Sequence, residues 1–421
     1  MKILLVVTGD TGLQYHRQIV PHKVLHRLTG NEVRIVHDFD KVSDIELQYF
    51  DIVQFIRQIS IKGKTKEIID RCHANGCKVV FDIDDNYNLP SHHGVFVEKM
   101  LLQKCKEYKQ ERVIQLSEYE SRQIPYKEYI ANVRQAIEHA DLVTTTTEHL
   151  RNFIGKGEVI PNCIDMQEEQ WNTKAEKSDK LRFGWIGGLW HQGDLELMSR
   201  SISYVYSDKS LKDYQFVLGG FNLEDNFQHH VAEFHKNNPA YMYGNNPCYK
   251  ARLNEIQNRS QYLRYEDILS DNKRMISNDH KRYLQNTIKS DFHTPESYRR
   301  VWGKSINQYA TIYDTIDISL APLRSNAFNN CKSELKIIEA AAKKKAIIVT
   351  DCLPYSMFPN DTVYKVATYD NQKGWYKAVK KFIGNRQMVD DYAGKIQEYV
   401  NIHYNLEKWT AIRLQMYQDI L

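Results

Sequence analysis

Four clusters of polar residues contain side chains that could bind phosphate groups, bind a metal ion or transfer a proton. Each cluster directly follows a short apolar run of the kind that forms a buried strand. The clusters are Gly9–Arg17, Asp82–Asn86, Gly187–Asp194 and Arg324–Ser333. Because open parallel sheets bind ligands at the carboxyl ends of their strands, these clusters are the candidate functional residues.

The segment Phe328–Asp351, FNNCKSELKIIEAAAKKKAIIVTD, predicts a helix that leads into a buried strand. Lys332 and Ser333 lie at the predicted helix start, where free amide groups and the helix dipole attract an anion such as phosphate. The same pattern is also typical of a solvated helix face with ion pairs between successive turns, so both interpretations stay open. One face of the predicted helix carries four charged residues: Lys332, Lys336, Glu339 and Lys343.

The stretch FDIDDN places Asp82, Asp84 and Asp85 at the end of a predicted strand. Three carboxylates in this position would suit Mg²⁺ or Mn²⁺ holding a diphosphate, because both ions prefer oxygen ligands. Alternatively, one aspartate caps the following segment and the other two face water. The pattern is equally compatible with these two interpretations.

The stretch GDTGLQYHR predicts a glycine loop, with Gly9 and Gly12, that opens a helix. Arg17 lies one turn inside this helix, where its side chain could face a ligand. The loop lacks the pattern G-x-G-x-x-G and an acidic residue placed to bind a ribose, so a plain NAD site is disfavoured. The two glycines could equally make a tight turn.

The stretch WIGGLWHQGD places Gly187 and Gly188 where the backbone must approach another group closely. Trp190 and His191 follow at the predicted strand end. Trp190 is a candidate for donor binding, with packing against a neighbouring segment as the alternative. His191 is a candidate contact for a sugar or a phosphate.

The composition indicates a soluble globular protein, and 421 residues suit two domains. The net charge of +4 is too small to indicate nucleic acid by itself, but it is compatible with an anionic ligand or an acidic lipid surface. The 7 cysteines are scattered without a CxxC pair, so we expect neither disulfides nor structural zinc, and a reducing cytoplasm. No apolar run approaches the roughly 20 residues of a membrane helix, and MKILLVVTGD predicts a first strand rather than a signal peptide.

Strand-like runs alternate with helical patterns along the chain, which predicts an α/β fold with two doubly wound, Rossmann-like domains facing a central cleft. The first predicted domain covers 1–172 and includes a long helical stretch, Glu98–His139. The second covers 178–385 and includes an insertion at about 222–294. Helical patterns at 386–421 are expected to pack back toward the N-terminal domain.

Three segments resemble motifs of the retaining glycosyltransferases of group 1, family 4. VIPNCID, at Val159–Asp165, is similar to the V-I-P-N-G-V-D segment that closes the N-terminal domain of that family. LRFGWIGGLW resembles the strand and glycine loop that open the donor domain. IDISLAPL followed by KSELKIIEAAAKKKAIIVTD resembles the most characteristic block, and its K-S-x-L-K variant, like FDIDDN, looks like a bacterial surface-polysaccharide or phage-type branch.

This resemblance spans nearly the whole chain and implies the two-Rossmann fold named GT-B, with a nucleotide-sugar held mainly by the C-terminal domain. Glu339 matches the glutamate that binds the ribose hydroxyls in that family. Lys332, Ser333 and the nearby amides then become candidate phosphate contacts, with Lys336 a weaker one.

The sequence departs from the family pattern at three places. Cys331 stands where the first glutamate of the Glu-x7-Glu motif is expected, and Glu334 is off that spacing. WHQGD replaces the arginine and lysine that often follow the glycine loop. Asp84 and Asp85 stand where a histidine–aspartate pair is expected, so Asp84 would take the histidine's role beside the transferred sugar and the two aspartates are the candidate catalytic residues.

We therefore expect a cytoplasmic glycosyltransferase that moves a sugar from a nucleotide-diphosphate-sugar to an acceptor hydroxyl. The resemblance implies retention of configuration and a role in surface-polysaccharide assembly. No metal or other cofactor is required if Lys332 and the helix dipole carry the diphosphate charge, and Mg²⁺ or Mn²⁺ at FDIDDN is the alternative.

The expected acceptor is a glycan or a lipid-linked sugar. The lysine-rich stretch Glu98–His139 would suit an acidic lipid surface and a peripheral membrane contact, with a plain surface helix as its alternative. Three other functions share the fold: a phage-type enzyme that glucosylates DNA bases, a sugar-nucleotide epimerase, and a non-catalytic sugar-nucleotide-binding module.

Overall fold

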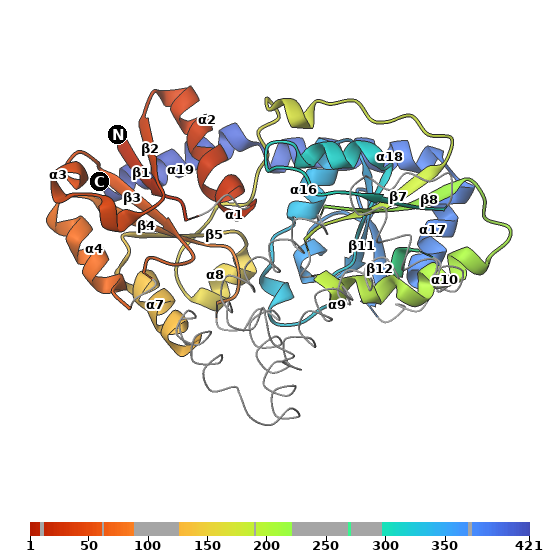
Figure 1. The fold of residues 1–421 in the computed structure, drawn as a ribbon, viewed down its shortest axis with the longest axis horizontal. Helices are drawn as coiled ribbons and strands as arrows, with labels where there is room; N and C mark the ends of the chain where they lie inside the picture. The colour runs from red at the N-terminus through yellow and green to blue at the C-terminus, as the bar shows by residue number, and fades with distance from the viewer. Residues whose placement is uncertain are drawn as a thin grey trace, which may run out of the picture. The chain divides into compact units, whose positions relative to one another are not determined.

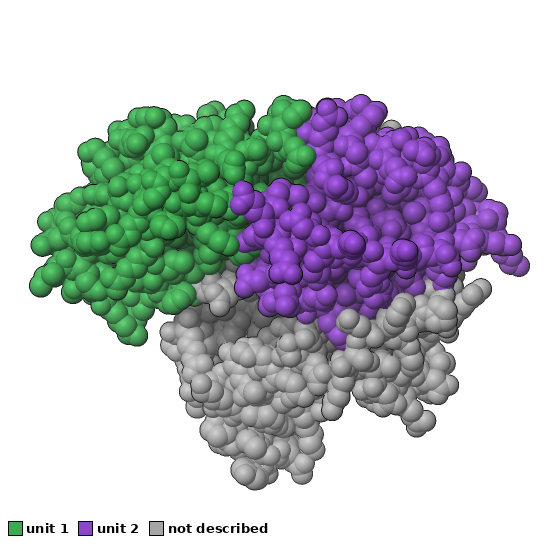
Figure 2. Space-filling model, turned by 90° about the horizontal axis from the view of Figure 1, so that it is seen from above, with its two compact units in different colours: residues 1–165, 326–338, 400–421 green, residues 166–325, 339–399 purple. Residues whose placement is uncertain are grey.

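The computed structural model describes residues 1–8, 12–60, 63–87, 126–188, 191–220, 268–270, 297–368 and 373–421. These residues divide into two compact units, which Figure 2 distinguishes by colour. Unit 1 comprises Met1–Asp165, Asn326–Ile338 and Val400–Leu421, and unit 2 comprises Met166–Ser325 and Glu339–Tyr399. Most of the predicted stretch Glu98–His139 and of the insertion at 222–294 lies outside the described residues.

The sheet of unit 1 has six strands in the order β2-β1-β3-β4-β5-β6, and all neighbouring strands are parallel (Figure 1). The strand order reverses between β1 and β3, which is the switch point where such sheets bind ligands. The strands are β1 (Lys2–Val6), β2 (Glu32–Val36), β3 (Ile52–Ile56), β4 (Lys78–Ile83), β5 (Leu142–Thr145) and β6 (Glu158–Val159).

Helices cover both faces of this sheet, so its central strands are apolar on both sides. One core lies between the sheet and the pair α4 (Thr65–Ala74) and α7 (Tyr126–His139). The other lies beneath α2 (Val20–Thr29) and α19 (Leu406–Ile420). Tyr417 of α19 and His22 of α2 share a hydrogen bond of 3.0 Å, which places the end of the chain against unit 1.

Shorter helical elements connect the strands of unit 1. After the short helix α1, a π-helical turn, η1, leads directly into α2. Thr147 caps α8 by accepting from Leu150 N, and Gly155 ends that helix with a left-handed φ of 79°. The elements are α1 (Gly12–Gln14), η1 (Tyr15–Ile19), η2 (Phe39–Lys41), α3 (Asp44–Leu47), α8 (Glu148–Ile154) and η8 (Asn329–Cys331).

The sheet of unit 2 also has six parallel strands, in the order β12-β11-β10-β7-β8-β9. Its order reverses between β10 and β7, so the switch point lies at the carboxyl ends of these two strands. The strands are β7 (Leu181–Ile186), β8 (Tyr214–Gly219), β9 (Tyr298–Val301), β10 (Ile318–Ala321), β11 (Ala346–Asp351) and β12 (Tyr364–Ala367).

The apolar core of unit 2 lies between the sheet and the helices α9, α10 and α17, and Trp375 is completely enclosed within it. The helical elements are η3 (Glu169–Trp171), α9 (Gln192–Leu195), η5 (Glu196–Met198), α10 (Ser199–Ser207), η7 (Tyr309–Thr315), η9 (Leu353–Tyr355), α17 (Gly374–Gly384) and α18 (Gln387–His403). Two helices, α16 (Leu335–Ala342) and α18, contribute residues to both units.

The predicted fold class, α/β with two doubly wound parallel sheets, is confirmed. The helix predicted from Phe328 begins later than expected, at Leu335. Asn326 Oδ1 accepts from the amide of Asn329 and initiates the short turn η8, after which Lys332 is extended with ψ 154°. Lys332 and Ser333 therefore precede the helix instead of forming its first turn.

The helical pattern predicted at the end of the chain is interrupted before Leu406, where Asn405 caps α19 by accepting from Lys408 N. None of the helices in the described part of the chain is both long enough and apolar enough to span a lipid bilayer.

Candidate active site

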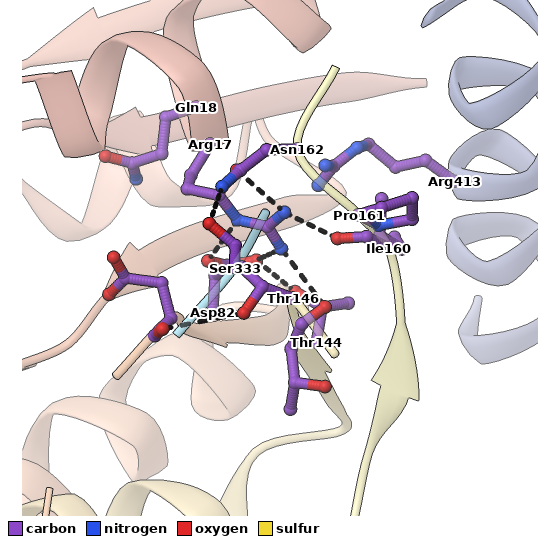
Figure 3. Close-up of polar contacts among 12 residues, drawn as sticks. Arg17, Gln18, Asp82, Thr144, Thr146, Ile160, Pro161, Asn162, Ser333 and Arg413 are labelled. Atoms are coloured by element: carbon purple, nitrogen blue, oxygen red, sulfur yellow. Dashed lines mark hydrogen bonds and ion pairs between the residues drawn. The ribbon is translucent and has the colours of Figure 1, made fainter. Parts of the chain in front are cut away.

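At the carboxyl edge of the unit 1 sheet, Arg17 and Asp82 form an ion pair that the protein encloses completely (Figure 3). Arg17 belongs to η1, and Asp82 lies near the end of β4. Arg17 Nε and Nη2 donate to the two carboxylate oxygens of Asp82 at 2.9 and 2.6 Å. Thr144 Oγ1 also donates to Asp82, at 2.5 Å. The carboxylate of Asp82 is thus held by three donors.

All the donors of Arg17 are used inside the protein. A guanidinium carries five N–H groups, and three of them remain after the two bonds to Asp82. Nη1 donates to the carbonyl of Ile160 at 2.5 Å and to Asn162 Oδ1 at 3.4 Å. Nη2 also donates to the carbonyl of Thr145 at 3.4 Å. The sequence pattern allows Arg17 to face a ligand, but in the structure its guanidinium connects η1 to the ends of β4, β5 and β6.

Asp84 and Asp85 form a second cluster with Arg57, which follows β3. Arg57 Nε and Nη2 donate to the carboxylate of Asp84 at 2.6 and 2.9 Å, and Nη2 also donates to Asp85. The side chains are 39% exposed for Arg57, 17% for Asp84 and 29% for Asp85. Neither predicted alternative for FDIDDN describes this arrangement, because Asp82 is enclosed and the other two aspartates are ion-paired.

Arg57 is not among the site residues predicted from the sequence, although its position in the chain could have indicated a functional residue. Arg57 directly follows the apolar run of β3, so it lies at a carboxyl strand end like the four polar clusters. Its φ is 57°, in the left-handed region that residues other than glycine rarely adopt. Strained backbone of this kind is concentrated at functional sites. Arg57 also lies beside the switch point of unit 1.

The burial and the charges of this cluster shift the pKa values of Arg57 and Asp85. Burial lowers the pKa of Arg57, but Asp84 and Asp85 outweigh that effect and the net shift is upward. Burial raises the pKa of Asp85, and the adjacent Asp84 carboxylate raises it further, while Arg57 and Lys332 act in the opposite direction. Arg57 is therefore a permanent cation, and Asp85 holds a proton more readily than an isolated aspartate.

The segment Asn326–Ile338 belongs to unit 1 and lies against residues that follow its strands. Asn86, the last residue of FDIDDN, donates through Nδ2 to Cys331 Sγ at 3.6 Å. Asn162, within VIPNCID, donates through Nδ2 to Ser333 Oγ at 2.8 Å. The predicted site motif FDIDDN and the segment VIPNCID, which the sequence did not predict as part of the site, thus both contact this segment.

Lys332 and Lys336 lie on either side of the start of α16. Lys332 lowers the pKa of Asp85, so its charge acts on the Arg57 cluster. Lys336 is in the first turn of α16 and is partly exposed. Glu334, between them, is 3% exposed. Burial raises the pKa of Glu334 to about 7, although a hydrogen bond from Tyr404 lowers it.

In unit 2, the glycine loop after β7 does make a close backbone approach, as its sequence predicts. A Cβ on Gly187 would lie 2.7 Å from the indole of Trp185. A Cβ on Gly220, whose φ is 102°, would lie 2.8 Å from the amide nitrogen of Gly187. The loops after β7 and β8 therefore contact each other. Gly188 is exposed, and a Cβ there would meet no atom within 4 Å, so the close approach predicted for both glycines is present only at Gly187. Trp190 lies outside the described residues.

The switch point of unit 2 carries a charged cluster at the ends of β7 and β10. His191 Nδ1 lies 3.0 Å from Asp194 Oδ2, and Asp194 Oδ1 accepts from the amide of Arg324 at 2.9 Å. Arg324 Nη2 donates to Glu196 at 3.0 Å, and its side chain is 48% exposed. Arg324 follows β10 and opens the polar cluster Arg324–Ser333, so the strand-end rule predicts it as it predicts His191.

Glu339 is enclosed within unit 2 by two tyrosines. It is 3% exposed, and its carboxylate accepts hydrogen bonds from Tyr309 at 3.1 Å and from Tyr313 at 2.8 Å. Lys343, directly after the end of α16, pairs with Asp314 at 2.7 Å. The interpretation of this helix face as a row of solvated ion pairs is therefore wrong at both positions.

The glycine loop after β1 is described only from Gly12 onward, and Gly9 lies outside the described residues. A Cβ on Gly12 would meet no atom within 4 Å, and its φ is not left-handed. The structure thus shows no close approach at Gly12, and the predicted turn between Gly9 and Gly12 lies largely outside the described residues. Across the parts of the chain that are described, no group of three histidine, cysteine or acidic residues is arranged to hold a metal ion.

The sequence matches no family model and no curated protein. Among solved structures, Anabaena HepE in complex with UDP is similar over 100% of both chains, with a TM-score of 0.55 and 11% identity. An alpha-glucosyltransferase in complex with UDP and a 13-mer DNA containing an HMU base is similar over 99% of this chain and 98% of that one, with a TM-score of 0.55 and 10% identity. A glycosyltransferase from Rickettsia africae is similar over 100% and 98% of the two chains, with a TM-score of 0.51 and 12% identity.

These similarities establish the fold. The two parallel six-stranded sheets with their flanking helices form the pair of Rossmann-like units found in GT-B glycosyltransferases.

Proposed function

We propose that this protein is a glycosyltransferase that moves a sugar from a nucleotide-diphosphate-sugar to an acceptor hydroxyl, with retention of configuration. One observation carries the proposal: in a chain that shares the GT-B fold over its full length, both sheets have charged clusters at their switch points. Such positions bind ligands in doubly wound folds. The neighbouring structures contain UDP, which supports a nucleotide ligand.

The nucleoside part of the donor is assigned to unit 2. Glu339 binds the ribose hydroxyls, and Tyr309 and Tyr313 fix the orientation of its carboxylate. The backbone at Gly187 and Gly188 lines the switch point, where His191 and Arg324 offer polar contacts. Because a carboxylate accepts several hydrogen bonds at once, the two tyrosines are compatible with a ligand role for Glu339.

The diphosphate is assigned to Lys332, Ser333 and Lys336. Lys332 and Lys336 supply positive charge to the departing diphosphate, which stabilises the charge that develops as the sugar leaves. Arg324 takes the role of the cation that the sequence lacks after the glycine loop. With this charge supplied by the protein, we propose that the reaction requires no metal ion.

Asp84 and Asp85 are the proposed catalytic groups. The ion pair with Arg57 keeps Asp84 oriented, and Asp85 holds a proton more readily than usual because burial and Asp84 raise its pKa. Asp84 can accept a hydrogen bond from one hydroxyl of a sugar, and Asp85, in its protonated form, can donate a hydrogen bond to another. Asp84 would stabilise positive charge that develops on the transferred sugar.

Nucleotide binding tests the proposal directly. Purified protein is heated with UDP, ADP and GDP in turn, because the base is not assigned. A ligand at 100 times its dissociation constant raises the free energy of unfolding by about 2.7 kcal/mol, which shifts the melting temperature measurably. Hydrolysis or transfer from the matching nucleotide-sugar then identifies the donor. If none of the three diphosphates raises the melting temperature, the proposed function is wrong.

The acceptor is proposed to be a glycan or a lipid-linked sugar, in the cytoplasm and at the membrane surface. The residues expected to serve it, Glu98–His139 and 222–294, lie largely outside the described ranges. Vesicles of anionic lipid test the membrane contact, and a charge reversal of Lys104, Lys106 and Lys109 should abolish vesicle binding without changing donor affinity.

DNA is a second candidate acceptor, because one structure with the same TM-score of 0.55 contains DNA. Binding to duplex DNA that weakens steeply with salt would favour that acceptor. A sugar-nucleotide epimerase would instead convert the donor without any acceptor.

A further inference from the structure

Asn162 connects the enclosed ion pair of unit 1 to Ser333, as Figure 3 shows. Asn162 follows β6 within VIPNCID and is 6% exposed. Its Oδ1 accepts from Arg17 Nη1 at 3.4 Å, and its Nδ2 donates to Ser333 Oγ at 2.8 Å. The contacts therefore run in an unbroken series from Asp82 through Arg17 and Asn162 to Ser333.

The orientation of the Asn162 carboxamide follows from the chemistry of Arg17. A guanidinium has only N–H donors, so the group that faces it must be the carboxamide oxygen. Asp82 holds the guanidinium in place with a pair of charged hydrogen bonds. The carboxamide nitrogen is consequently directed at Ser333, and an NH₂ group can only donate.

This orientation decides the direction of the Ser333 hydroxyl. A hydroxyl has one donor hydrogen and two acceptor lone pairs. Because Asn162 donates to it, Ser333 Oγ acts as the acceptor in that contact. The hydrogen of the hydroxyl is left to donate to another group, and the side chain of Ser333 is partly exposed.

We propose that Asn162 is a positioning residue that turns the Ser333 hydroxyl into a hydrogen-bond donor for an ionised phosphate oxygen of the donor diphosphate. The inference rests on the proposed function, which assigns Ser333 to the diphosphate. An ionised phosphate oxygen accepts hydrogen bonds and cannot donate them. A hydroxyl held as a donor therefore favours this ligand over one that presents its own N–H or O–H group.

Two substitutions at Asn162 separate this role from a simple tether between β6 and the segment Asn326–Ile338. Asn162→Asp keeps the size of the side chain and can still contact Arg17 and Ser333, but it accepts from Ser333 and consumes the hydroxyl hydrogen. Asn162→Ala removes the contact and leaves the hydroxyl free to rotate. A tether predicts that the alanine variant binds UDP more weakly, whereas our inference predicts that the aspartate variant does.

A double-mutant cycle removes the contribution of the added negative charge. UDP affinity is measured by calorimetry for Asn162→Asp and Asn162→Ala, each with Ser333 intact and with Ser333→Ala. We expect Ser333→Ala and Asn162→Asp each to weaken UDP binding about 10- to 100-fold, as for a lost hydrogen bond to a charged group. When Ser333 is already alanine, Asn162→Asp should weaken UDP binding by a smaller factor, because only the repulsion between the new carboxylate and the diphosphate remains.

Asn152→Asp makes the same chemical change on the exposed surface of α8 and should leave UDP affinity unchanged. Equal losses for Asn162→Asp with and without the Ser333 hydroxyl would overturn the inference, as would tighter binding by the aspartate variant than by the alanine variant. If the unaltered protein binds none of UDP, ADP and GDP, the proposed function fails first and the inference fails with it.

Discussion

Two arginine–aspartate pairs at the carboxyl edge of the unit 1 sheet have the same chemistry in different surroundings. Arg17 and Asp82 have side chains that are 1% and 0% exposed, and every N–H of Arg17 has an acceptor inside the protein. Arg57 and Asp84 have side chains that are 39% and 17% exposed, and Arg57 has a left-handed backbone. Only one residue separates Asp82 from Asp84 in the chain.

The difference shows that residue type and spacing do not assign a role to either aspartate. An enclosed pair whose N–H donors are all used holds elements together, because neither side chain is accessible to a ligand. A partly exposed pair with a strained arginine remains able to contact one. We therefore assign a structural role to Asp82 and a role in contacting the ligand to Asp84.

The largest expected effect tests the structural role of the enclosed pair Arg17–Asp82. Arg17→Met leaves the Asp82 carboxylate enclosed without its partner, so we expect a loss of about 3–5 kcal/mol in the free energy of unfolding. Arg17→Met combined with Asp82→Leu removes both charges and should recover most of that loss. Urea unfolding of the three proteins measures both quantities.

The matched control for Arg17→Met is Arg34→Met, because Arg34 and Glu46 form an exposed pair at 3.1 Å. That substitution should cost less than about 1 kcal/mol. Similar losses in the free energy of unfolding at Arg17 and Arg34 would show that enclosure does not distinguish the two pairs. The structural role assigned to the Arg17–Asp82 pair would then be wrong.

The next effect concerns Glu334, an enclosed carboxyl whose hydrogen-bond partner is a tyrosine instead of an arginine. Burial raises the pKa of Glu334 to about 7 from an ordinary value of 4.5. Between these two values the folded protein binds more protons than the unfolded chain, so stability falls as the pH rises through this window. The maximum slope is about 1.4 kcal/mol per pH unit.

We therefore expect the unaltered protein to lose roughly 2–3 kcal/mol relative to Glu334→Gln between pH 4.5 and 7. Urea unfolding of both proteins across this range measures the difference between them, in which the other titrating groups cancel. Parallel pH profiles for the two proteins would mean that Glu334 is ionised in the folded state and that its proton does not contribute to stability.

If Asp84 has a chemical role, Asp84→Asn should severely impair catalysis with little change in stability. The substitution removes the charge beside the transferred sugar, and we expect kcat to fall about 100-fold, which corresponds to about 2.7 kcal/mol. Because the pair with Arg57 is partly exposed, unfolding should change by less than about 1 kcal/mol. Full activity in Asp84→Asn would remove this residue from the proposed mechanism.

The same assay distinguishes a carboxylate role from metal binding. Asp82 is engaged by Arg17, which leaves only Asp84 and Asp85 of the FDIDDN stretch accessible. We expect transfer to continue in EDTA at its initial rate. Loss of activity on chelation, with recovery in Mg²⁺ or Mn²⁺, would instead make the two aspartates metal ligands.

Both sheets could be predicted from the sequence because most of their strands are short apolar runs that are buried on both faces, as in Ile52–Ile56. The strand β9, Tyr298–Val301, could not, since its sequence YRRV contains two arginines. Arg299 pairs with Glu176 at 2.6 Å, and Arg300 lies 4.7 Å from the ring of Trp302. These partners, not an apolar pattern, allow the strand to be buried.

The candidate site was predictable as a set of positions but not as a set of contacts. The strand-end rule identified the aspartates of FDIDDN and the segment from Arg324 to Ser333, and applied fully it would also have included Arg57. The sequence around Arg17 does not indicate that it pairs with Asp82, because the two residues lie 65 positions apart in the chain. The two tyrosines that hold Glu339 likewise belong to η7, a different element.

The smallest expected effect concerns Glu339, which is buried like Asp82 but has neutral tyrosines as its partners. Glu339→Gln keeps an acceptor for Tyr309 and Tyr313 and removes the charge, so the protein should remain folded. We expect its affinity for the nucleotide to fall about 10-fold, or about 1.4 kcal/mol, as the ribose hydroxyls lose a charged acceptor.

Tyr309→Phe is the matched control, because it leaves the carboxylate in place and removes one of its two donors. It should lower the melting temperature more than it changes nucleotide affinity. The contrary pattern, in which Glu339→Gln destabilises the protein while nucleotide affinity is unchanged, would place Glu339 with Asp82 as an internal support. The ribose contact would then have to come from another residue of unit 2.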